Sequence, residues 1–303
     1  MTLRHLLEID DLTGNELATI LDLSEKPHSR CLEGKGVALI FEKPSLRTRH
    51  SAEMAVFQLG GHPAYISNAE ISMGRRETTE DIMQNLQGYY AVIAARVFDH
   101  GHLERMVSVA EVPVINLLSD SGHPVQALAD LLTIRQHVGP LDRVTIAWVG
   151  DFSNVARSLA LGAATLGASL RICTPPGYGP TPEDLDRLAA QAIGAATVRV
   201  FDRPVDAVQG ANVVSTDAWY SMGQEAEKET RHRAFEGFQI DSALMSRAGR
   251  GAVFLHCLPA HRGEEATSEV LDSAQSRIWP QAHNRLHTFR GLLSWLSEQG
   301  AIR

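Results

Sequence analysis

The chain has 303 residues, of which 44% are hydrophobic and 21% charged, and its formal net charge is −8 at pH 7. At roughly 100–200 residues per domain, this length predicts two domains, each with its own core. The negative charge argues against a protein that binds nucleic acids or anionic membranes. The ordinary composition argues against a collagen or a disordered protein. Any anionic substrate therefore has to be bound by a local cluster of arginines.

The cysteines and the first residues indicate the compartment. Cys31, Cys173 and Cys257 are far apart and form no CxxC pair. This spacing argues against a disulfide framework or a structural zinc site and favours a reducing environment. The N-terminal sequence reaches acidic residues too early for a signal peptide, and no apolar run approaches the ~18 residues of a membrane helix. We expect a soluble cytoplasmic protein.

Short apolar runs alternate with helix-length segments along the chain. In the first half, the runs of strand character are Gly36–Phe41, Pro63–Ile66, Ala91–Val97 and Pro113–Leu118. In the second half, they are Val144–Val149, Ser169–Thr174, Thr197–Phe201, Asn212–Thr216 and Ala252–Leu255. The helix-length segments include Arg47–Leu59, Pro124–Val138, Asn154–Leu166, Pro182–Ile193 and Gln224–Phe238. This alternation predicts βαβ units and parallel sheets.

The predicted strands divide into two sheets of four or five strands. Gly139-Pro140 breaks the chain after the helix that begins at Pro124, so we place the boundary between domains 1–138 and 139–303 there. One apolar stripe at helical spacing comprises Leu286, Phe289, Leu292, Leu293 and Leu296. It predicts a long final helix that packs on either domain or across both. The fold class is α/β, with two mostly parallel sheets flanked by helices.

The first candidate site follows the first strand, in the sequence Phe41-Glu42-Lys43-Pro44-Ser45-Leu46-Arg47-Thr48-Arg49. Backbone N–H groups of a first helical turn are unpaired and carry the positive end of the helix dipole. Together with hydroxyl groups and an arginine fork they would form a phosphate cradle. An ordinary Ser45 N-cap before a solvated basic turn is the alternative. Neither GxxxxGK[ST] nor GxGxxG occurs, so nucleotide binding is not indicated.

The second candidate is His123-Pro124-Val125-Gln126. A neutral imidazole just before a helix can donate to a polarised carbonyl, and Gln126 lies one turn further along. A surface histidine followed by a polar helix residue is the alternative. We interpret Asp130 as structural. Arg96, at the end of a predicted strand, and Arg285, in the final helix, are ordinary residues when each is taken alone.

Two further candidates follow predicted strands of the second half. Cys257, in Leu255-His256-Cys257-Leu258-Pro259, is either a nucleophile or, as we favour, a small buried hydrophobic residue. Asp217 can hold a substrate ammonium group, and the loop Ser221-Met222-Gly223 can close over it. A solvated aspartate after a strand is the alternative.

Taken together, these strings resemble the aspartate/ornithine carbamoyltransferase family, and its ornithine branch most closely. Ser45-Leu46-Arg47-Thr48-Arg49 is similar to the family's Ser-Thr-Arg-Thr-Arg loop, and His123-Pro124-Val125-Gln126 to its His-Pro-x-Gln. His256-Cys257-Leu258-Pro259 matches its His-Cys-Leu-Pro. Asp217 with Ser221-Met222-Gly223 is similar to the signature that binds ornithine. The resemblance covers nearly the whole chain.

The resemblance implies a carbamoyl-phosphate-binding N-terminal domain and an ornithine-binding C-terminal domain. It implies transfer of the carbamoyl group to the δ-amine of L-ornithine, giving L-citrulline and phosphate, a step of arginine metabolism. The residues implied for carbamoyl phosphate are Ser45, Leu46, Arg47, Thr48, Arg96, His123, Gln126, Cys257, Leu258 and Arg285. Four of these, Arg96, His123, Cys257 and Arg285, are expected to be catalytic. The residues implied for ornithine are Asn154, Asp217, Ser221 and Met222.

The family also implies a homotrimer with active sites at subunit interfaces, and neither a metal nor an organic cofactor. Three positions depart from its pattern. Leu46 replaces a threonine, His283 replaces a glutamate near Arg285, and the sequence 71–77, where a neighbouring subunit reaches the ligand in related enzymes, matches poorly. The alternatives are a carbamoyltransferase for putrescine, an N-acylated ornithine or aspartate, and a non-catalytic carbamoyl-phosphate sensor. The Ser221-Met222-Gly223 loop argues against a carbamoyltransferase for one of the other amines. The presence of residues for both carbamoyl phosphate and ornithine argues against the sensor.

Overall fold

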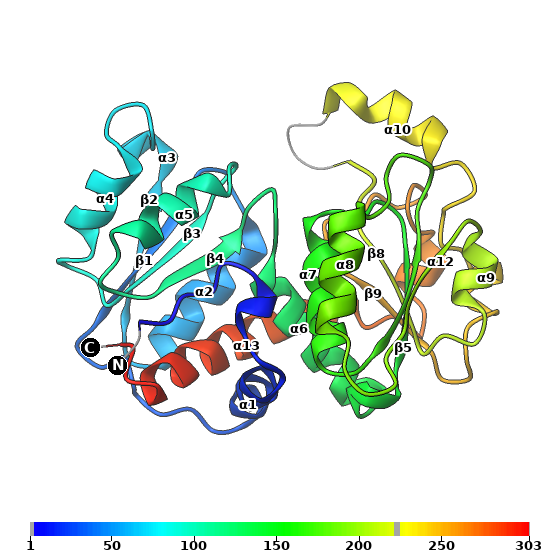
Figure 1. Ribbon diagram of the computed structural model, residues 1–303, viewed down its shortest axis with the longest axis horizontal. Helices are drawn as coiled ribbons and strands as arrows, with labels where there is room; N and C mark the ends of the chain where they lie inside the picture. Colours follow the sequence, from blue (N-terminus) through cyan, green and yellow to red (C-terminus); the bar gives the residue numbers. More distant parts are fainter. Residues whose placement is uncertain (1–2, 221–224, 303) are drawn as a thin grey trace. The chain divides into compact units, whose positions relative to one another are not determined.

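The computed structural model describes residues 3–220 and 225–302 (Figure 1). By internal contacts it divides into two compact units, Met1–Ala129 with His283–Arg303, and Asp130–Ala282. Helices α6 (Pro124–His137) and α13 (Ile278–Glu298) each contribute residues to both units. The sequence predicts a domain boundary between residues 138 and 139. The division into compact units rests on contacts and does not test that boundary, which stays a prediction. In the described residues no helix is long and apolar enough to cross a membrane.

The first unit contains a parallel four-stranded sheet in the order β2-β1-β3-β4. Its strands are β1 (Gly36–Phe41), β2 (His62–Ser67), β3 (Val92–Arg96) and β4 (Val114–Leu118). Its complete helices are a 3-10 turn (Ile9–Asp11), α1 (Gly14–Glu25), α2 (Leu46–Gln58), α3 (Asn68–Ile71), α4 (Thr79–Leu86) and α5 (Gly101–Ser108). The inner strands β1 and β3 are buried on both faces and almost continuously apolar, as parallel strands usually are, whereas the edge strand β2 is partly exposed.

Side chains alternate between the two faces of this sheet. One face of β1 and β3 packs against α4 and α5 in a core of Ala38, Ile40, Ile82, Met83, Ile93, Ala95, Leu103 and Met106. On the opposite face lie α2, α1 and the part of α13 that belongs to this unit (Figure 1). The predicted apolar stripe of α13 is buried there, since Leu292 and Leu293 are fully buried.

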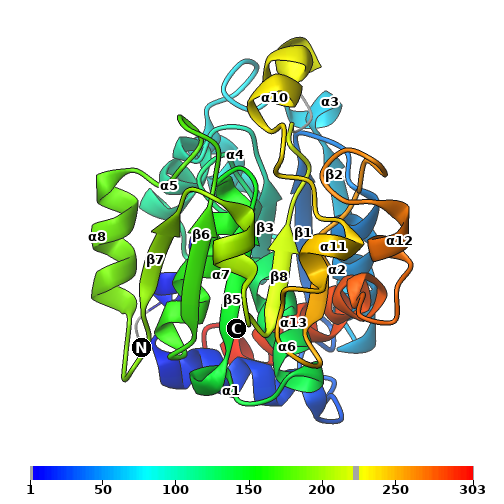
Figure 2. The same ribbon diagram turned by 90° about the vertical axis from the view of Figure 1, so that its right-hand side faces the viewer.

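The second unit contains a parallel five-stranded sheet in the order β7-β6-β5-β8-β9, and Figure 2 labels its strands β7, β6, β5 and β8. Its strands are β5 (Thr145–Val149), β6 (Ser169–Cys173), β7 (Val198–Phe201), β8 (Val213–Thr216) and β9 (Val253–His256). Its complete helices are a 3-10 turn (Leu141–Arg143), α7 (Asn154–Thr165), α8 (Pro182–Gln191), α9 (Pro204–Val208), a second 3-10 turn (Glu225–Glu227), α10 (Lys228–Ala234), α11 (Ser242–Met245) and α12 (Ser268–Leu271).

The predicted fold class, the nine strands and the two parallel sheets are confirmed. Gln224 lies outside the described residues, and over the rest of its range the predicted helix Gln224–Phe238 is wrong in its length, because α10 covers only Lys228–Ala234 after a 3-10 turn. Phe235 and Phe238 are both buried in the core of the second unit, on either side of Gly237. Gly237 has a φ of 86°, which favours glycine and ends the helical path so that both rings reach the core.

Candidate functional site

In each sheet, the chain order reverses direction at one pair of neighbouring strands. In the first unit β2 lies on one side of β1, and β3 and β4 lie on the other. In open α/β sheets, ligands bind beyond the carboxyl ends of the strands at such a switch point. The segment that follows β1 carries Ser45 and Thr48, and Arg96 ends β3. The topology therefore brings two of the sequence-predicted segments to one edge.

Ser45 is the N-cap of α2, and its Oγ accepts from the Thr48 N–H at 3.3 Å. The expected cap is thus present, which by itself satisfies only one of the unpaired N–H groups of the first turn. Leu46 is 71% exposed, so its backbone rather than its side chain is what it can offer to a ligand. A leucine in place of threonine at this position keeps the N–H donor and loses one hydroxyl.

The guanidinium of Arg285, on α13, contacts three polar side chains of the first unit. Its Nη1 donates to Oε1 of Gln126 at 2.5 Å and lies 3.3 Å from Nε2 of His123, and its Nη2 donates to Oγ1 of Thr48 at 3.1 Å. All four side chains are buried. His283, which replaces a glutamate of the family pattern, is exposed. Arg285 nevertheless keeps its contacts with these three partners. Residues far apart in the sequence thus form one cluster.

Burial and positive charge determine the protonation of His123. Desolvation lowers the pKa of His123 well below its ordinary value, and the charges of Arg285, Arg96, Lys43 and Arg47 lower it further. The imidazole is therefore neutral at pH 7. Because Arg285 can only donate, Nε2 of His123 accepts, and the proton resides on Nδ1. The result is a neutral N–H donor surrounded by cations.

Lys43 is a further candidate for the site that the sequence analysis missed. Burial lowers the pKa of Lys43 to about 8, and the neighbouring Arg96 contributes to the decrease. Its Nζ lies 4.7 Å from the centre of the Phe98 ring. The signal in the sequence was its place two residues before the Ser45 cap. A lysine there is one more cation at the carboxyl end of β1, and it titrates near physiological pH.

A network of backbone and side-chain hydrogen bonds fixes the loop before His123. Nδ2 of Asn116, on β4, donates to the carbonyl groups of Leu7 at 2.8 Å and Gly122 at 3.2 Å. The Gly122 N–H donates to Oγ of Ser119 at 3.3 Å. A Cβ at Gly122 would collide with the buried carboxylate of Glu8. A side chain at this position would displace that carboxylate from its place beside the start of α6.

The second unit has its own switch point, between β5 and β8, because β6 and β7 lie on one side of β5 and β8 and β9 on the other. Asn154 begins α7 shortly after β5, and Asp217 directly follows β8. Oγ1 of Thr216 donates to the carbonyl of Val149 at 2.6 Å and so joins the two strand ends. A Cβ on Gly150, whose φ is 139°, would lie 3.0 Å from that hydroxyl oxygen. The predicted ornithine residues Asn154 and Asp217 thus follow the two central strands.

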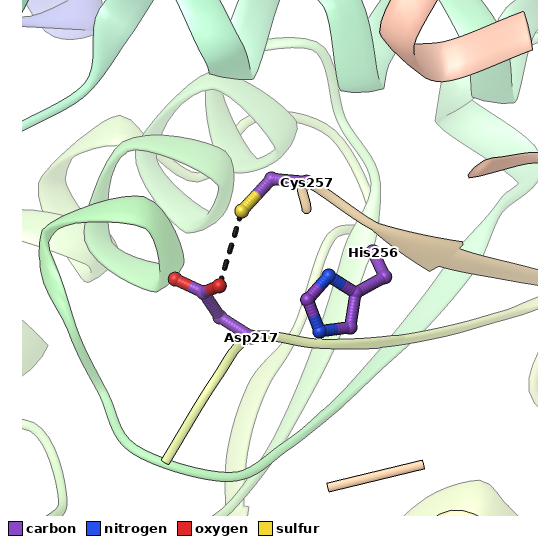
Figure 3. A group of neighbouring side chains, drawn as sticks. All are labelled: Asp217, His256 and Cys257. Atoms are coloured by element: carbon purple, nitrogen blue, oxygen red, sulfur yellow. Dashed lines mark hydrogen bonds between the residues drawn. The ribbon is translucent and has the colours of Figure 1, made fainter. Parts of the chain in front are cut away.

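Cys257, after β9, contacts Asp217 directly (Figure 3). Its Sγ donates to Oδ1 of Asp217 at 3.1 Å, and the same oxygen accepts from the Ala218 N–H at 2.8 Å. The carboxylate favours the thiol over a thiolate, which argues against a nucleophilic cysteine. Both ring nitrogens of His256 are engaged, because Nδ1 accepts from the Leu258 N–H and Nε2 lies 3.0 Å from Oε1 of Glu265. His256 therefore supports the strand end rather than offering a ligand atom.

Asp151 and Arg231 are two further polar residues that the sequence analysis missed. Nη1 of Arg231 donates to Oδ2 of Asp151 at 2.8 Å and to the carbonyl of Trp219 at 2.9 Å. Burial raises the pKa of Asp151, and the nearby charge of Asp217 adds to this, whereas Arg231 opposes it. Arg231 therefore anchors the segment after Asp217 to the loop after β5. Ser221 and Met222, which the sequence predicts to bind ornithine, lie outside the described residues.

Asp130 is structural, as the sequence analysis interpreted it. Its Oδ1 accepts from Nε2 of Gln281 at 2.7 Å, and Oε1 of Gln281 accepts from the His256 N–H at 2.9 Å. The two side chains are buried and link α6 to the end of β9. A buried carboxylate hydrogen-bonded in this way stabilises the backbone at the strand end.

Comparisons with known proteins match the chain in two parts. The aspartate/ornithine carbamoyltransferase carbamoyl-P binding domain matches residues 4–136, and the Asp/Orn binding domain of the same family matches residues 142–296. The chain belongs to the aspartate/ornithine carbamoyltransferase family. Of the cluster around Arg285, Thr48, His123 and Gln126 lie within the first match, and Arg285 itself lies within the second. The residues Asn154, Asp217 and Cys257 lie within the second match of the carbamoyltransferase family.

Individual carbamoyltransferases are similar over nearly the whole chain. The ornithine carbamoyltransferase of Acidothermus cellulolyticus is 47% identical over 99% of this chain and 99% of its own length. The structure of the Pyrococcus furiosus ornithine carbamoyltransferase is 43% identical with a TM-score of 0.92, over 97% of this chain and 98% of that one. The anabolic ornithine carbamoyltransferase of Campylobacter jejuni is 34% identical with a TM-score of 0.93, over 98% and 100% of the two chains.

Proposed function

We propose that this protein transfers the carbamoyl group of carbamoyl phosphate to the δ-amine of L-ornithine, giving L-citrulline and phosphate. The observation that carries the proposal is the buried cluster of Thr48, His123, Gln126 and Arg285 at the switch point of the first sheet. This cluster offers one ligand the guanidinium of Arg285, the hydroxyl of Thr48, the amide of Gln126 and the neutral imidazole N–H of His123. The similarity to ornithine carbamoyltransferases over nearly the whole chain supports the same reaction.

The first half of the reaction is binding of carbamoyl phosphate. The α2 N-terminus, with Ser45, the Leu46 N–H, Arg47 and Thr48, would hold the phosphate. Arg96, His123, Gln126 and Arg285 would contact the carbamoyl group and stabilise the negative charge that develops on its oxygen. These donors are in place before the ligand arrives, so little reorganisation accompanies the charge change.

The second half is attack by the amine. Asn154, Asp217, Ser221 and Met222 would bind ornithine. An alkylammonium of pKa near 10.4 is nucleophilic in only about one molecule in 2,500 at pH 7, so the site has to favour the neutral amine. The amine nitrogen forms the new bond to the carbamoyl carbon, the C–O bond to phosphate breaks, and the amine loses a proton. Cys257 and Leu258 would position the carbamoyl group without forming a covalent intermediate.

We further propose a cytoplasmic homotrimer whose active sites lie at subunit interfaces. An apolar stripe on α2 supports association of the first unit, since Leu46, Met54 and Phe57 are 71%, 45% and 64% exposed. Exposed apolar side chains that share a helix face are typical of protein interfaces. Light scattering coupled to size exclusion tests this: a mass three times that of the chain is expected, and Phe57→Glu should lower it.

A citrulline assay tests the function. With carbamoyl phosphate as donor, ornithine should give a far higher kcat/KM than putrescine, N-acetylornithine or aspartate. If one of these amines is preferred, the assignment of Asp217 and the following loop is wrong. If none reacts although calorimetry detects carbamoyl-phosphate binding, the protein is a sensor rather than an enzyme.

A further inference from the structure

Lys43 carries an alkyl amine, the same reactive group as ornithine, and it lies beside the site proposed for carbamoyl phosphate. The lysines of the chain are Lys26, Lys35, Lys43 and Lys228. Lys43 follows β1 and comes two residues before Ser45, the N-cap of α2. An amine held next to an activated carbamoyl donor can react with it in the way that the δ-amine of ornithine does.

Contacts between β1 and the segment after β3 place this amine. Phe41 pairs with Arg96 in the parallel register of the two strands, and the Glu42 N–H donates to the Arg96 carbonyl at 2.9 Å. Nζ of Lys43 lies 4.7 Å from the centre of the Phe98 ring, two residues beyond Arg96. The amine therefore lies over the segment that follows Arg96, which the proposed function assigns to the carbamoyl group.

The carboxylates whose charges act on this amine hold backbone groups instead of pairing with it. Oε2 of Glu42 accepts from the Phe98 N–H at 2.7 Å, and Oδ1 of Asp120 accepts from the His100 N–H at 2.9 Å. In the described part of the chain, both carboxylates act on Lys43 through their charge and without a hydrogen bond to it. The ammonium form of Lys43 thus loses water on burial and gains no direct partner in return.

A neutral amine is the form that reacts, and the lysines differ in how readily they supply it. Burial lowers the pKa of Lys43 to about 8, so about one side chain in ten is neutral at pH 7, against about one in 2,500 for an ordinary lysine. A hydrogen bond with the Tyr220 side chain raises the pKa of Lys228. Nζ of Lys35 donates to the Ile302 carbonyl at 3.1 Å. We therefore expect the highest reactivity at Lys43.

We propose that Lys43 is a site of self-carbamoylation, at which bound carbamoyl phosphate modifies the protein when ornithine is absent. The neutral amine of Lys43 attacks the carbamoyl carbon, and the new C–N bond forms as the C–O bond to phosphate breaks. The phosphate leaves with the electron pair of that bond, and the amine nitrogen loses one proton to it. The products are a carbamoyl-lysine side chain and inorganic phosphate. The inference rests on the carbamoyl-phosphate half of the proposed function.

The modification removes one cation from the site. A carbamoyl-lysine is an uncharged urea, so the modified protein should bind carbamoyl phosphate more weakly. The bound phosphate dianion favours the ammonium form of Lys43. The modification is therefore slow beside citrulline formation, and it becomes faster as the pH rises. Ornithine protects Lys43, because it consumes the bound carbamoyl group first.

Peptide mass spectrometry tests the proposal. The full chain is incubated with carbamoyl phosphate at pH 7 and at pH 9, with and without ornithine, and each lysine is examined for the added mass of one HNCO unit. At pH 7 we expect the label at Lys43 to exceed that at Lys26 and Lys35 about tenfold or more, as their neutral fractions require. The label at Lys43 should increase at pH 9, decrease with ornithine, and vanish in Lys43→Arg.

Free isocyanate, which carbamoyl phosphate releases as it decomposes in water, is the other source of such a label. Cyanate supplies it directly and serves as the second reagent. Arg47→Gln should lower labelling of Lys43 by carbamoyl phosphate about tenfold, because a hydrogen bond to a charged group is lost, and leave labelling by cyanate unchanged. Arg49→Gln is the matched control and should be labelled as the wild type is, because Arg49 pairs with Glu53 at 2.8 Å. Inorganic phosphate should protect Lys43 of the wild type from carbamoyl phosphate, a test that needs no variant.

Two results would overturn the proposal. The first is the absence of label at Lys43, or equal label at Lys26 and Lys35. The second is equal labelling of the wild type and Arg47→Gln by carbamoyl phosphate, which would assign the label to isocyanate in solution. Citrulline formation is measured separately on untreated protein. Label without citrulline would contradict transfer to ornithine and keep this inference, whereas citrulline without label would do the reverse.

Discussion

The two half-sites have opposite electrostatic character. In the first unit Arg285, Arg96, Arg47 and Lys43 surround one neutral histidine, and their charges lower the pKa of His123. In the second unit the carboxylates of Asp151 and Asp217 lie close enough for Asp217 to raise the pKa of Asp151. A dianionic phosphate and an ammonium group require these opposite fields. The contrast is what the proposed function requires of the two switch points.

The half-sites also differ in how their residues are held. Thr48, His123 and Gln126 all contact Arg285, so the first half-site is one buried cluster assembled from α2, α6 and α13. In the second, the carboxylate of Asp217 accepts from the Cys257 thiol and the Ala218 N–H. Ser221 and Met222 complete it in our prediction. Substitutions that affect one substrate and not the other are the means to test this contrast.

The largest effect is expected for Asp217→Asn. Asparagine keeps the shape of the side chain and removes the charge that attracts the ammonium of ornithine, so kcat/KM for ornithine should fall about 100-fold, near 3 kcal/mol. Carbamoyl-phosphate affinity, measured by calorimetry, should stay within twofold because that cluster belongs to the other unit. Equal losses for both substrates would contradict the separation of the half-sites.

Arg47→Lys is expected to have the next largest effect, on the first half-site. Lysine keeps the charge but cannot form the two parallel hydrogen bonds of a guanidinium with phosphate. Activity should fall tenfold or more, since a hydrogen bond to a charged group contributes about 1.5–3 kcal/mol. Arg49→Lys, one position beyond Thr48, is the matched control, because Arg49 pairs with Glu53 at 2.8 Å. Near wild-type kinetics in Arg47→Lys would remove Arg47 from the site.

The pKa of Lys43 predicts that carbamoyl-phosphate binding and ornithine attack depend on pH in opposite directions. Its pKa of about 8 means that the cation is present below pH 8 and lost above it. The phosphate dianion favours the charged form, so carbamoyl-phosphate affinity should decrease as pH rises through about 8. Ornithine attack should instead become faster over the same range, as the fraction of neutral amine grows. Calorimetry from pH 6.5 to 9 should show the decrease, and Lys43→Met should abolish it; an unchanged slope in that variant would assign it to another group.

Cys257→Ser is expected to have the smallest effect. The hydroxyl can also donate to Asp217, so the orientation of the carboxylate is kept and only the fit of the larger sulfur is lost. Ornithine use should weaken a few-fold with measurable turnover, whereas the loss of a nucleophile would be near total. Mass spectrometry after incubation with carbamoyl phosphate alone should find no carbamoylated Cys257. A stable adduct there would contradict the positioning role.

Much of the fold and of the first half-site could be predicted from local sequence. The apolar runs and the helix-length segments between them determine nine strands in two parallel sheets, because parallel strands are buried on both faces. Ser45, with Arg47 and Thr48 after it, marks a helix N-terminus that can receive an anion. His123 and Gln126 are one helical turn apart and were identified on that ground.

Contacts between distant segments decided the rest. The burial of Phe235 and Phe238 in the core of the second unit ended the predicted helix 224–238 before its last residues, since the core outweighs local helix propensity. Nothing near Lys43 in the sequence reveals that burial and Arg96 lower its pKa, because both effects arise from the packing of β1 against β3.

By itself, the sequence determined where strands and helices alternate and which segments carry anion- and ammonium-binding side chains, because these follow from periodicity and residue chemistry. Only the tertiary structure placed Arg285 against Thr48, His123 and Gln126, and brought His232 to the loop of His261, Glu264 and Glu265. Residues so far apart in the sequence come into contact because of the strand order and the packing of helices on a sheet. Hydrogen-bond geometry and electrostatic shifts depend on those final distances, and no local pattern encodes them.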